Sequence, residues 1–157
     1  MATKSILMVC MGNICRSPMA EGILRDLARA RDIDIRIDSA GTIGNHVGES
    51  PDHRAQACMR GHGGNISDLR ARQVRANDLT DFDLVLAMDE DNLMDLHKLT
   101  TDRSLQAKAQ LIMDFAPDHP LREVPDPYYG GPDGFEQVYD MLTDACDRLL
   151  DELVPHA

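Results

Sequence analysis

The sequence is short of basic residues, of aromatic residues and of long apolar stretches. Lys and Arg total 16 against 27 Asp and Glu, which gives a formal net charge of −11. Nucleic-acid binding needs clustered Lys and Arg against the phosphate backbone, so we expect no nucleic-acid partner. No apolar run approaches the roughly 18 residues that a membrane span requires, so we expect no membrane insertion. There is no tryptophan, and nine methionines stand beside six aromatic residues, which indicates that methionine fills the core.

The four cysteines are too few and too scattered for a disulfide framework, so we expect reduced thiols. The first nine residues hold one lysine and a short apolar run, which is not the pattern of a cleavable signal. A cytoplasmic protein is therefore expected. At 157 residues the chain has the length of one domain, and we take residues 1–157 as a single unit.

Apolar patterning alternates between strand and helix along the chain. Strands are predicted at 6–9, 33–40, 82–87 and 109–113, and helices at 18–30, 51–60, 89–99 and 134–153, with a proline-rich stretch at 115–132. This order predicts an α/β fold of three layers, a doubly wound arrangement around a four-stranded parallel sheet. Ligands of such folds bind beyond the carboxyl ends of the strands.

One motif lies at the carboxyl end of the first predicted strand, between that strand and the first predicted helix. Cys10 and Arg16 are six positions apart, and Ser17 and Pro18 have the types expected of a helix N-cap and first turn. A helix N-terminus favours a bound dianion and a thiolate, so this segment is predicted to be a phosphate-binding loop with a nucleophile in its floor. Gly12 and Asn13 are expected to take the positive φ angles that let successive amides converge on one anion.

A Cys and an Arg at this spacing also occur by chance, as a buried thiol beside a surface charge, and the surrounding strand, loop and helix signals argue against that alternative. Attack on a phosphate ester also needs a proton for the leaving oxygen, and Asp126 is the candidate donor. It lies between two prolines and is followed by Tyr128 and Tyr129. From spacing alone, an ordinary Pro-Asp-Pro surface turn is an equally good interpretation.

Several segments together resemble a low-molecular-weight protein tyrosine phosphatase of the bacterial type, in order and over nearly the whole chain. The matching segments are Cys10–Pro18, Asp38–Thr42, Ala71–Gln73, Met88–Asp89 with Asn92, and Asp126–Gly130 with Gly134–Glu136.

The resemblance implies a cofactor-free and metal-free hydrolase acting on phosphotyrosine in proteins. It implies that Cys10 forms a phosphocysteine, that Arg16 holds the phosphoryl oxygens, and that Asp126 is the general acid and later the base. It also implies that Ser39 supports the loop and that the substrate is bound by the loop and the cleft rim, through Met11, Gly12, Asn13, Ile14, Cys15, Ser17, Asn45, Tyr128 and Tyr129.

Two positions depart from the family's pattern. Asn45 stands where bacterial members commonly have tryptophan, so one wall of the aryl slot is expected to be open or polar. Leu69 stands where many members have a histidine that braces the loop asparagine, and Ser39 is expected to suffice in its place.

The remaining cysteines and charges have plainer interpretations. The resemblance suggests that Cys15 forms a reversible disulfide with Cys10, the alternative being a small residue that fills space beneath the loop. Cys58 and Cys146 lie in helical patterns and are expected to pack in the core. No two histidines stand at ligand spacing with a carboxylate or thiol, so no metal site is expected. An acidic cluster is expected to be a solvated rim with helix-capping charges, and it comprises Asp78, Asp81, Asp83, Asp89, Glu90 and Asp91.

Two other functions remain open at this point. An arsenate reductase shares the fold and the Cys-x5-Arg loop, but it needs further mobile thiols near Cys10. A phosphoprotein-binding module without turnover would need neither nucleophile nor acid. The expected partner is a phosphotyrosine-containing protein, with a bacterial tyrosine kinase as one case, and the expected assembly is a monomer or weak dimer.

Overall fold

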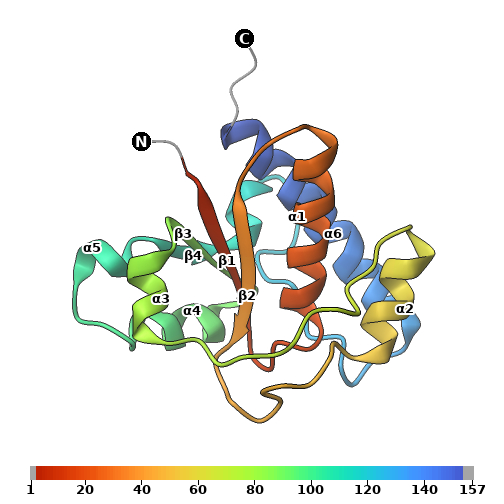
Figure 1. Ribbon diagram of the computed structural model, residues 1–157, viewed down its shortest axis with the longest axis horizontal. Helices are drawn as coiled ribbons and strands as arrows, with labels where there is room; N and C mark the ends of the chain where they lie inside the picture. The colour runs from red at the N-terminus through yellow and green to blue at the C-terminus, as the bar shows by residue number, and fades with distance from the viewer. Residues whose placement is uncertain (1–2, 154–157) are drawn as a thin grey trace.

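A computed structural model describes residues 3–153 of the chain. A four-stranded sheet, all parallel and in the order β2-β1-β3-β4, lies between two helical layers (Figure 1). The predicted α/β fold class is confirmed. The elements are β1 Ser5–Cys10, α1 Arg16–Ala30, β2 Arg36–Gly41, α2 His53–Gly61, α3 Ala76–Asp81, β3 Leu84–Ala87, α4 Glu90–His97, α5 Arg103–Gln106, β4 Ala109–Leu111, η1 Ile112–Phe115 and α6 Pro132–Leu153.

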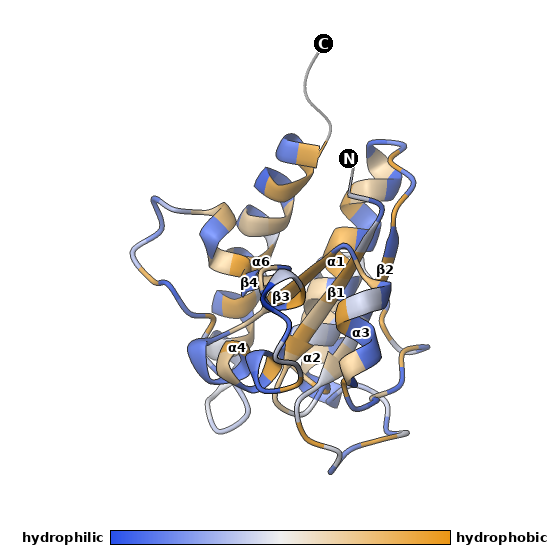
Figure 2. Ribbon diagram, turned by 90° about the vertical axis from the view of Figure 1, so that its left-hand side faces the viewer, coloured by the Kyte–Doolittle hydropathy of each residue, from blue (hydrophilic) through white to orange (hydrophobic). Residues whose placement is uncertain are grey.

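Strand β1 is the centre of the core because both of its faces are covered. Every residue from Ser5 to Cys10 is buried. Ile6 and Met8 turn to the layer of α1, α2 and α6, whereas Leu7 and Val9 turn to the layer of α3 and α4. Hydrophobic residues accordingly gather on this strand and on the helix faces toward it (Figure 2). No helix among residues 3–153 is both long enough and apolar enough to cross a bilayer.

The structure differs from the predicted elements mainly at their ends. The second strand begins at Arg36, not at 33, because Asp32 has a φ of 56° and the Ile33 amide bonds the Ala28 carbonyl at 2.8 Å, which ends α1. The fourth strand ends at Leu111, where the chain turns into the 3-10 helix η1. The short helices α3 and α5 were not predicted, because six and four residues are too few to show a helical period.

The carboxyl ends of three strands meet at one edge of the sheet, as predicted. The Thr42 amide bonds the Cys10 carbonyl at 3.0 Å, and the Met88 amide bonds the Val9 carbonyl at 3.1 Å. Gly41 allows the closest approach, since a Cβ at this position would lie 2.7 Å from the carbonyl oxygen of Met11. The edge therefore holds the loop after β1 against the segments after β2 and β3.

Candidate active site

Two backbone carbonyls of the loop between β1 and α1 accept hydrogen bonds from segments outside the loop. The Met11 carbonyl accepts the Ile43 amide at 3.0 Å, and the Ile14 carbonyl accepts the Asp52 amide at 2.8 Å. Within residues 3–153, the amides of Gly12, Ile14 and Cys15 donate no hydrogen bond to the protein. A loop with free backbone amides at a helix N-terminus is suited to bind an anion.

Cys10 lies in the floor of this loop and is 3% exposed. The Asn13 amide donates to its sulfur at 3.3 Å, and Ser17 Oγ lies 3.0 Å from the same sulfur. Asn13 Nδ2 also donates to Ser17 Oγ at 2.8 Å, which leaves the Ser17 hydroxyl proton to point at sulfur. Both contacts place a hydrogen-bond donor on the Cys10 sulfur.

Ser17 is not the N-cap of the first helix, so that prediction was wrong. Helix α1 begins at Arg16, two residues before the predicted start, with Cys15 at the N-cap position and no side-chain cap. The Ser17 side chain is fully buried and is committed to Cys10 and Asn13. A sequence pattern cannot separate a cap from this use, because both need a hydroxyl beside free amides.

Asn13 links the loop to Ser39 and to the backbone of Arg72. It has a φ of 58°, its Nδ2 donates to Ser39 Oγ at 3.0 Å, and its Oδ1 accepts the Arg72 amide at 3.0 Å. The prediction of positive φ was correct for Asn13 and wrong for Gly12, which does not have positive φ. At Gly12 a Cβ would lie 3.1 Å from the His46 ring, so a larger residue there would require that ring to shift.

Support for Asn13 continues through Ser39 to Glu21. The Ser39 hydroxyl donates to Glu21 Oε1 at 2.6 Å, and Arg25 pairs with the other Glu21 oxygen at 2.7 Å. Burial raises the pKa of Glu21 above its ordinary value, although the Ser39 hydrogen bond opposes the rise. Leu69, in place of the family's histidine, packs against the core. The contacts of Asn13 with Ser39 are therefore made without a histidine.

Arg16 is buried beneath the loop and fixed by two partners. Its Nη1 donates to Asp89 Oδ2 at 2.7 Å and to the Val124 carbonyl at 3.0 Å, and its side chain is 3% exposed. Burial opposes the charge, but Cys10 and the Asp89 contact raise the pKa of Arg16 above its ordinary value. The guanidinium is thus held as a cation with Nη1 occupied on the side of Asp89 and Val124.

Two members of the acidic cluster are not solvated rim residues, which corrects that prediction. Asp89 caps α4 by accepting the Asn92 amide at 2.8 Å with one oxygen while the other holds Arg16. Asp78 is 5% exposed and accepts two hydrogen bonds of 3.0 Å from Arg72. The capping part of the interpretation holds for Asp89, but its second oxygen has a role that the sequence did not show.

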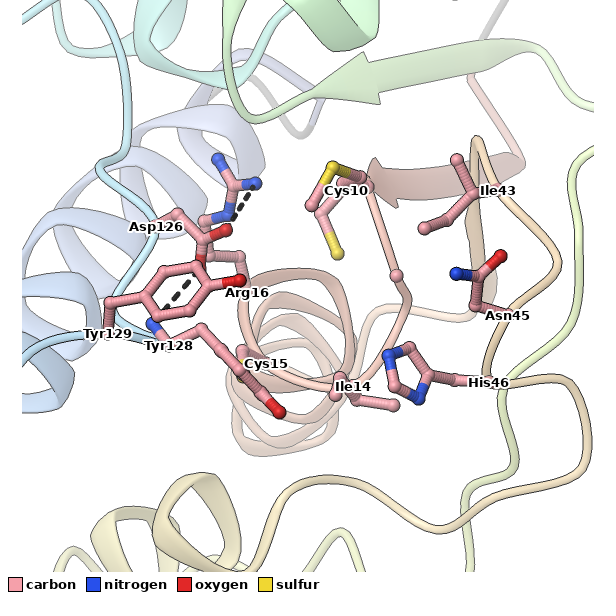
Figure 3. Close-up of a pocket in the computed structure, with 12 residues that line it drawn as sticks. Cys10, Ile14, Cys15, Arg16, Ile43, Asn45, His46, Asp126, Tyr128 and Tyr129 are labelled. Atoms are coloured by element: carbon pink, nitrogen blue, oxygen red, sulfur yellow. Dashed lines mark hydrogen bonds and ion pairs between the residues drawn. The ribbon is translucent and has the colours of Figure 1, made fainter.

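A cavity of about 200 Å³ opens above Cys10. Figure 3 shows Tyr128, Tyr129 and Asp126 on one side of the loop, with Ile43, Asn45 and His46 opposite. Tyr129 is 91% exposed and meets Tyr128 edge to face at 5.0 Å. Most of the residues predicted to bind substrate line the cavity, together with the predicted catalytic residues: Met11, Gly12, Ile14, Cys15, Asn45, Tyr128 and Tyr129, with Cys10, Arg16 and Asp126. Ile43 and His46 also line it and were not predicted, whereas Asn13 and Ser17 were predicted and do not line it.

Asp126 faces Arg16 across the mouth of this cavity (Figure 3). Its Oδ2 lies 3.8 Å from Arg16 Nη2, and its Oδ1 accepts the Tyr128 amide at 3.0 Å. The side chain is 34% exposed. The surface turn and the proton-donor position, which the sequence offered as alternatives, coincide in this segment. The hydrogen bond from the Tyr128 amide to Oδ1 of Asp126 forms the turn, and the turn directs Oδ2 of Asp126 toward the cavity.

The other three cysteines are buried free thiols. Cys15 lines the cavity, and burial, together with Asp52 and Cys10, raises its pKa to about 12. Cys146 is fully buried in α6, as predicted for core packing. Cys58 is also buried in α2, but its sulfur reaches Glu136 Oε1 at 3.5 Å, so it is not surrounded by apolar atoms alone.

Comparison with known proteins identifies relatives over the whole of this architecture. Residues 5–156 match the family model described as low molecular weight phosphotyrosine protein phosphatase. The human protein of that name is 42% identical over 154 residues, which cover 96% of each chain. Among solved structures, a protein tyrosine phosphatase from Entamoeba histolytica has a TM-score of 0.91 and 37% identity, covering 96% of this chain and 97% of that one. YfkJ from Bacillus subtilis has a TM-score of 0.89 and 39% identity, covering 97% and 95%.

Proposed function

The chain belongs to the low molecular weight phosphotyrosine protein phosphatase family, and from that premise we propose that hydrolysis proceeds through a phosphocysteine at Cys10. Proteins of this family hydrolyse phosphotyrosine, and this chain is a protein-tyrosine phosphatase. One observation supports the proposed route above others. The Cys10 sulfur lies in the floor of the cavity with two polar contacts on it, and Arg16 and Asp126 line the same cavity.

In the first step the Cys10 thiolate attacks phosphorus in line with the tyrosine oxygen. An S–P bond forms, the P–O bond to the aryl group breaks, and the Asp126 carboxylic acid gives its proton to the leaving phenolate. The free amides of the loop and Nη2 of Arg16 bind the three non-bridging oxygens, whose charge must be stabilised throughout the transfer.

In the second step the phosphocysteine is hydrolysed. The Asp126 carboxylate takes a proton from water, the water oxygen attacks phosphorus, and the S–P bond breaks to restore the Cys10 thiolate and release inorganic phosphate. The Ser17 hydroxyl stabilises that thiolate as a leaving group because it lies 3.0 Å from the sulfur. Asn13 and Ser39 act as positioning residues that keep the loop in its left-handed turn.

The walls of the cavity suit an aryl ester. Tyr128 and Tyr129 on one side and Ile14 and Ile43 on the other offer apolar faces to a phenyl ring. Asn45 is exposed at the same mouth, so one wall is open and polar, as its departure from the family pattern led us to expect. We infer that the substrate's tyrosine ring is held mainly from the Tyr128 side.

The proposal is tested by hydrolysis of para-nitrophenyl phosphate in the presence of EDTA, comparing the natural chain with Cys10→Ser. We expect turnover that survives chelation and disappears with the sulfur. A rapid burst of nitrophenol and trapping of a phosphorylated Cys10 by acid quench would identify the intermediate. Turnover by Cys10→Ser at the natural rate would contradict the mechanism.

The role of Asp126 is tested by the dependence on the leaving group. Asp126→Asn is expected to slow hydrolysis of phenyl phosphate, a poor leaving group, by about 10² to 10⁴, and to spare esters with good leaving groups. Asp133→Asn is the matched control, since Asp133 is an exposed carboxylate seven residues along that does not line the cavity. An equal loss for good and poor leaving groups would remove Asp126 from the acid role.

The two alternative functions give different results in the same assays. An arsenate reductase needs further thiols near Cys10, and Cys58 and Cys146 are buried in the separate helices α2 and α6. Arsenate reduction without phosphatase turnover would favour it. A phosphoprotein-binding module would retain phosphotyrosine peptide without releasing phosphate.

We further propose that the substrates are phosphotyrosine-containing proteins that include a bacterial tyrosine kinase, and that the enzyme acts in the cytoplasm as a monomer or weak dimer. The exposed rings of Tyr128 and Tyr129 at the mouth support a protein substrate, because they extend the contact surface beyond the phosphorylated residue. The substrate is tested by release of phosphate from an autophosphorylated kinase. The assembly is tested by sedimentation at several concentrations, and the location by cell fractionation.

A further inference from the structure

Three side chains with metal-binding atoms converge where the end of α2 meets the first turns of α6. They are Cys58, His62 and Glu136, and their ligand atoms all lie within 4.8 Å of one another. Cys58 Sγ is 3.5 Å from Glu136 Oε1, and His62 Nε2 is 2.8 Å from Glu136 Oε2. The cavity above Cys10 is lined by other residues, so this cluster is separate from the catalytic centre.

The donor set and its spacing fit Zn²⁺. Thiolate, imidazole and carboxylate are the three ligand types of zinc, with bond lengths of about 2.0–2.3 Å. At tetrahedral angles these lengths put a sulfur and an oxygen ligand about 3.6 Å apart, and a nitrogen and an oxygen about 3.4 Å apart. The observed 3.5 Å between Cys58 Sγ and Glu136 Oε1 is already such a spacing. His62 Nε2 lies 2.8 Å from the other oxygen of Glu136, Oε2, so this pair needs to separate by about 0.6 Å, which an exposed carboxylate allows.

The surroundings hold two of the ligands in place. Cys58 and His62 are four positions apart at the end of α2 and therefore lie on the same face. The His62 ring stacks on Tyr139 with 3.7 Å between centroids and 7° between planes. Cys58 is 8% exposed, whereas His62 and Glu136 are exposed, so an ion has an open side from which to enter.

We propose that Cys58, His62 and Glu136 form a Zn²⁺ site that joins α2 to α6. Zn²⁺ displaces the thiol proton of Cys58 to solvent, and His62 binds through Nε2 in the tautomer that carries its proton on Nδ1. The fourth position is open to water or to Asp140, which lies one turn beyond Glu136 and whose charge acts on Cys58.

Such a site would hold together the two helices that contact the segment carrying Asp126. That segment runs directly into α6, which begins at Pro132, four residues before Glu136. At the start of α2, Arg54 donates to the Tyr128 carbonyl at 2.9 Å. An ion at the end of α2 therefore ties together the two helices that flank the Asp126 turn. We expect metal to stabilise the fold and not to enter the chemistry.

The test is Co²⁺ titration of metal-free protein in a Cys10→Ser background, so that the catalytic sulfur cannot bind the ion. One equivalent of Co²⁺ is expected to produce a sulfur-to-cobalt charge-transfer band, and Zn²⁺ to abolish the band and raise the melting temperature. Cys58→Ser should lose the band. His62→Phe keeps the stacked ring, folds for that reason, and should bind Co²⁺ more than about 100-fold more weakly, above the 10- to 100-fold cost of losing an outer-shell partner.

His53→Ala is the matched control, because His53 is an exposed histidine at the opposite end of the same helix. It should bind Co²⁺ with unchanged affinity. No band in the parent, or a band that survives Cys58→Ser, would overturn the site. A band lost in Cys58→Ser but unchanged in His62→Phe would also overturn it, since that outcome describes a thiolate adduct without the cluster. None of these measurements depends on phosphatase activity, so their outcome is independent of the mechanism proposed for Cys10.

Discussion

Replacement of Asp89 by Asn separates the two uses of this residue. Asn caps a helix as well as Asp does, so the contact with the Asn92 amide is retained and the charge opposite Arg16 is removed. Two unit charges about 4 Å apart attract by about 4 kcal/mol at an effective dielectric constant of 20. Removing one partner of a buried pair costs about 3–5 kcal/mol. Because the amide oxygen can still accept one hydrogen bond from Arg16, we expect a loss of about 2–3 kcal/mol in the free energy of unfolding.

The same substitution should lower kcat. With residue 89 neutral, the ion pair on Nη1 of Arg16 is lost and its hydrogen bond to the Val124 carbonyl remains. The guanidinium group is then less firmly oriented toward the phosphoryl oxygens. Loss of about 1.4–2.7 kcal/mol of transition-state stabilisation corresponds to a kcat about 10- to 100-fold lower. Urea unfolding and para-nitrophenyl phosphate kinetics measure the two effects on one preparation.

The control for Asp89→Asn is Asp102→Asn. Asp102 caps α5 in the same manner, by accepting the Ser104 amide at 2.9 Å, but it is exposed and has no arginine partner among the described residues. We expect this control to change the free energy of unfolding by less than about 1 kcal/mol and to leave kcat unchanged. Identical effects of the two substitutions would refute the argument that Asp89 orients Arg16.

Three further predictions concern the support of the loop. The pKa of Glu21 is raised in the folded state, so above about pH 4.5 the folded natural chain holds a proton that the unfolded chain has lost, and its free energy of unfolding falls as pH rises. Glu21→Gln lacks this loss and should gain stability relative to the natural chain over that range. Urea unfolding at several pH values checks the sign. Gly41→Ala should lower the free energy of unfolding by about 1–3 kcal/mol, since its Cβ meets backbone atoms of Met11, and should slow turnover. Peroxide inactivation should be reversed by added thiol in the natural chain and not in Cys15→Ser, and equal recovery would show that Cys15 does not shield Cys10.

The local part of the site could be predicted because it lies in one continuous segment. A buried strand, a cysteine, residues that tolerate positive φ and a helix start follow each other between positions 6 and 18, and each has its own sequence signal. The parallel sheet also followed from the alternation of elements, which placed the ends of β1, β2 and β3 at one edge, but the strand order was not predicted. The segment could not show whether the Ser17 hydroxyl caps the helix or contacts the Cys10 sulfur, and the structure has the second arrangement.

Ser39 and the role of Asp126 were expected from the family resemblance, but the other long-range contacts of the site were not predicted, because only the finished sheet brings their residues together. Arg16 and Asp89 are 73 positions apart, and Asn13 and the Arg72 amide are 59 apart. Asp89 has the sequence signal of a helix cap and nothing in the sequence marks its second oxygen as occupied. The metal cluster is of the same kind, since Glu136 lies 74 positions beyond His62 and spacing along the chain cannot show that the two helices meet.

The pairing of three arginines around the loop limits the range over which this chain, of net charge −11, attracts a dianion. Each is paired with its own carboxylate, in the pairs Arg16–Asp89 at 2.7 Å, Arg54–Asp52 at 3.0 Å and Arg72–Asp78 at 3.0 Å. Their positive fields are therefore largely cancelled at distances beyond the Debye length of about 8 Å, where the acidic surface dominates. A phosphoryl group is attracted only once it reaches the free amides and Nη2 of Arg16. Approach of an acidic phosphoprotein must therefore depend on contacts made by the exposed rim, and added salt should speed this approach because it screens the repulsion.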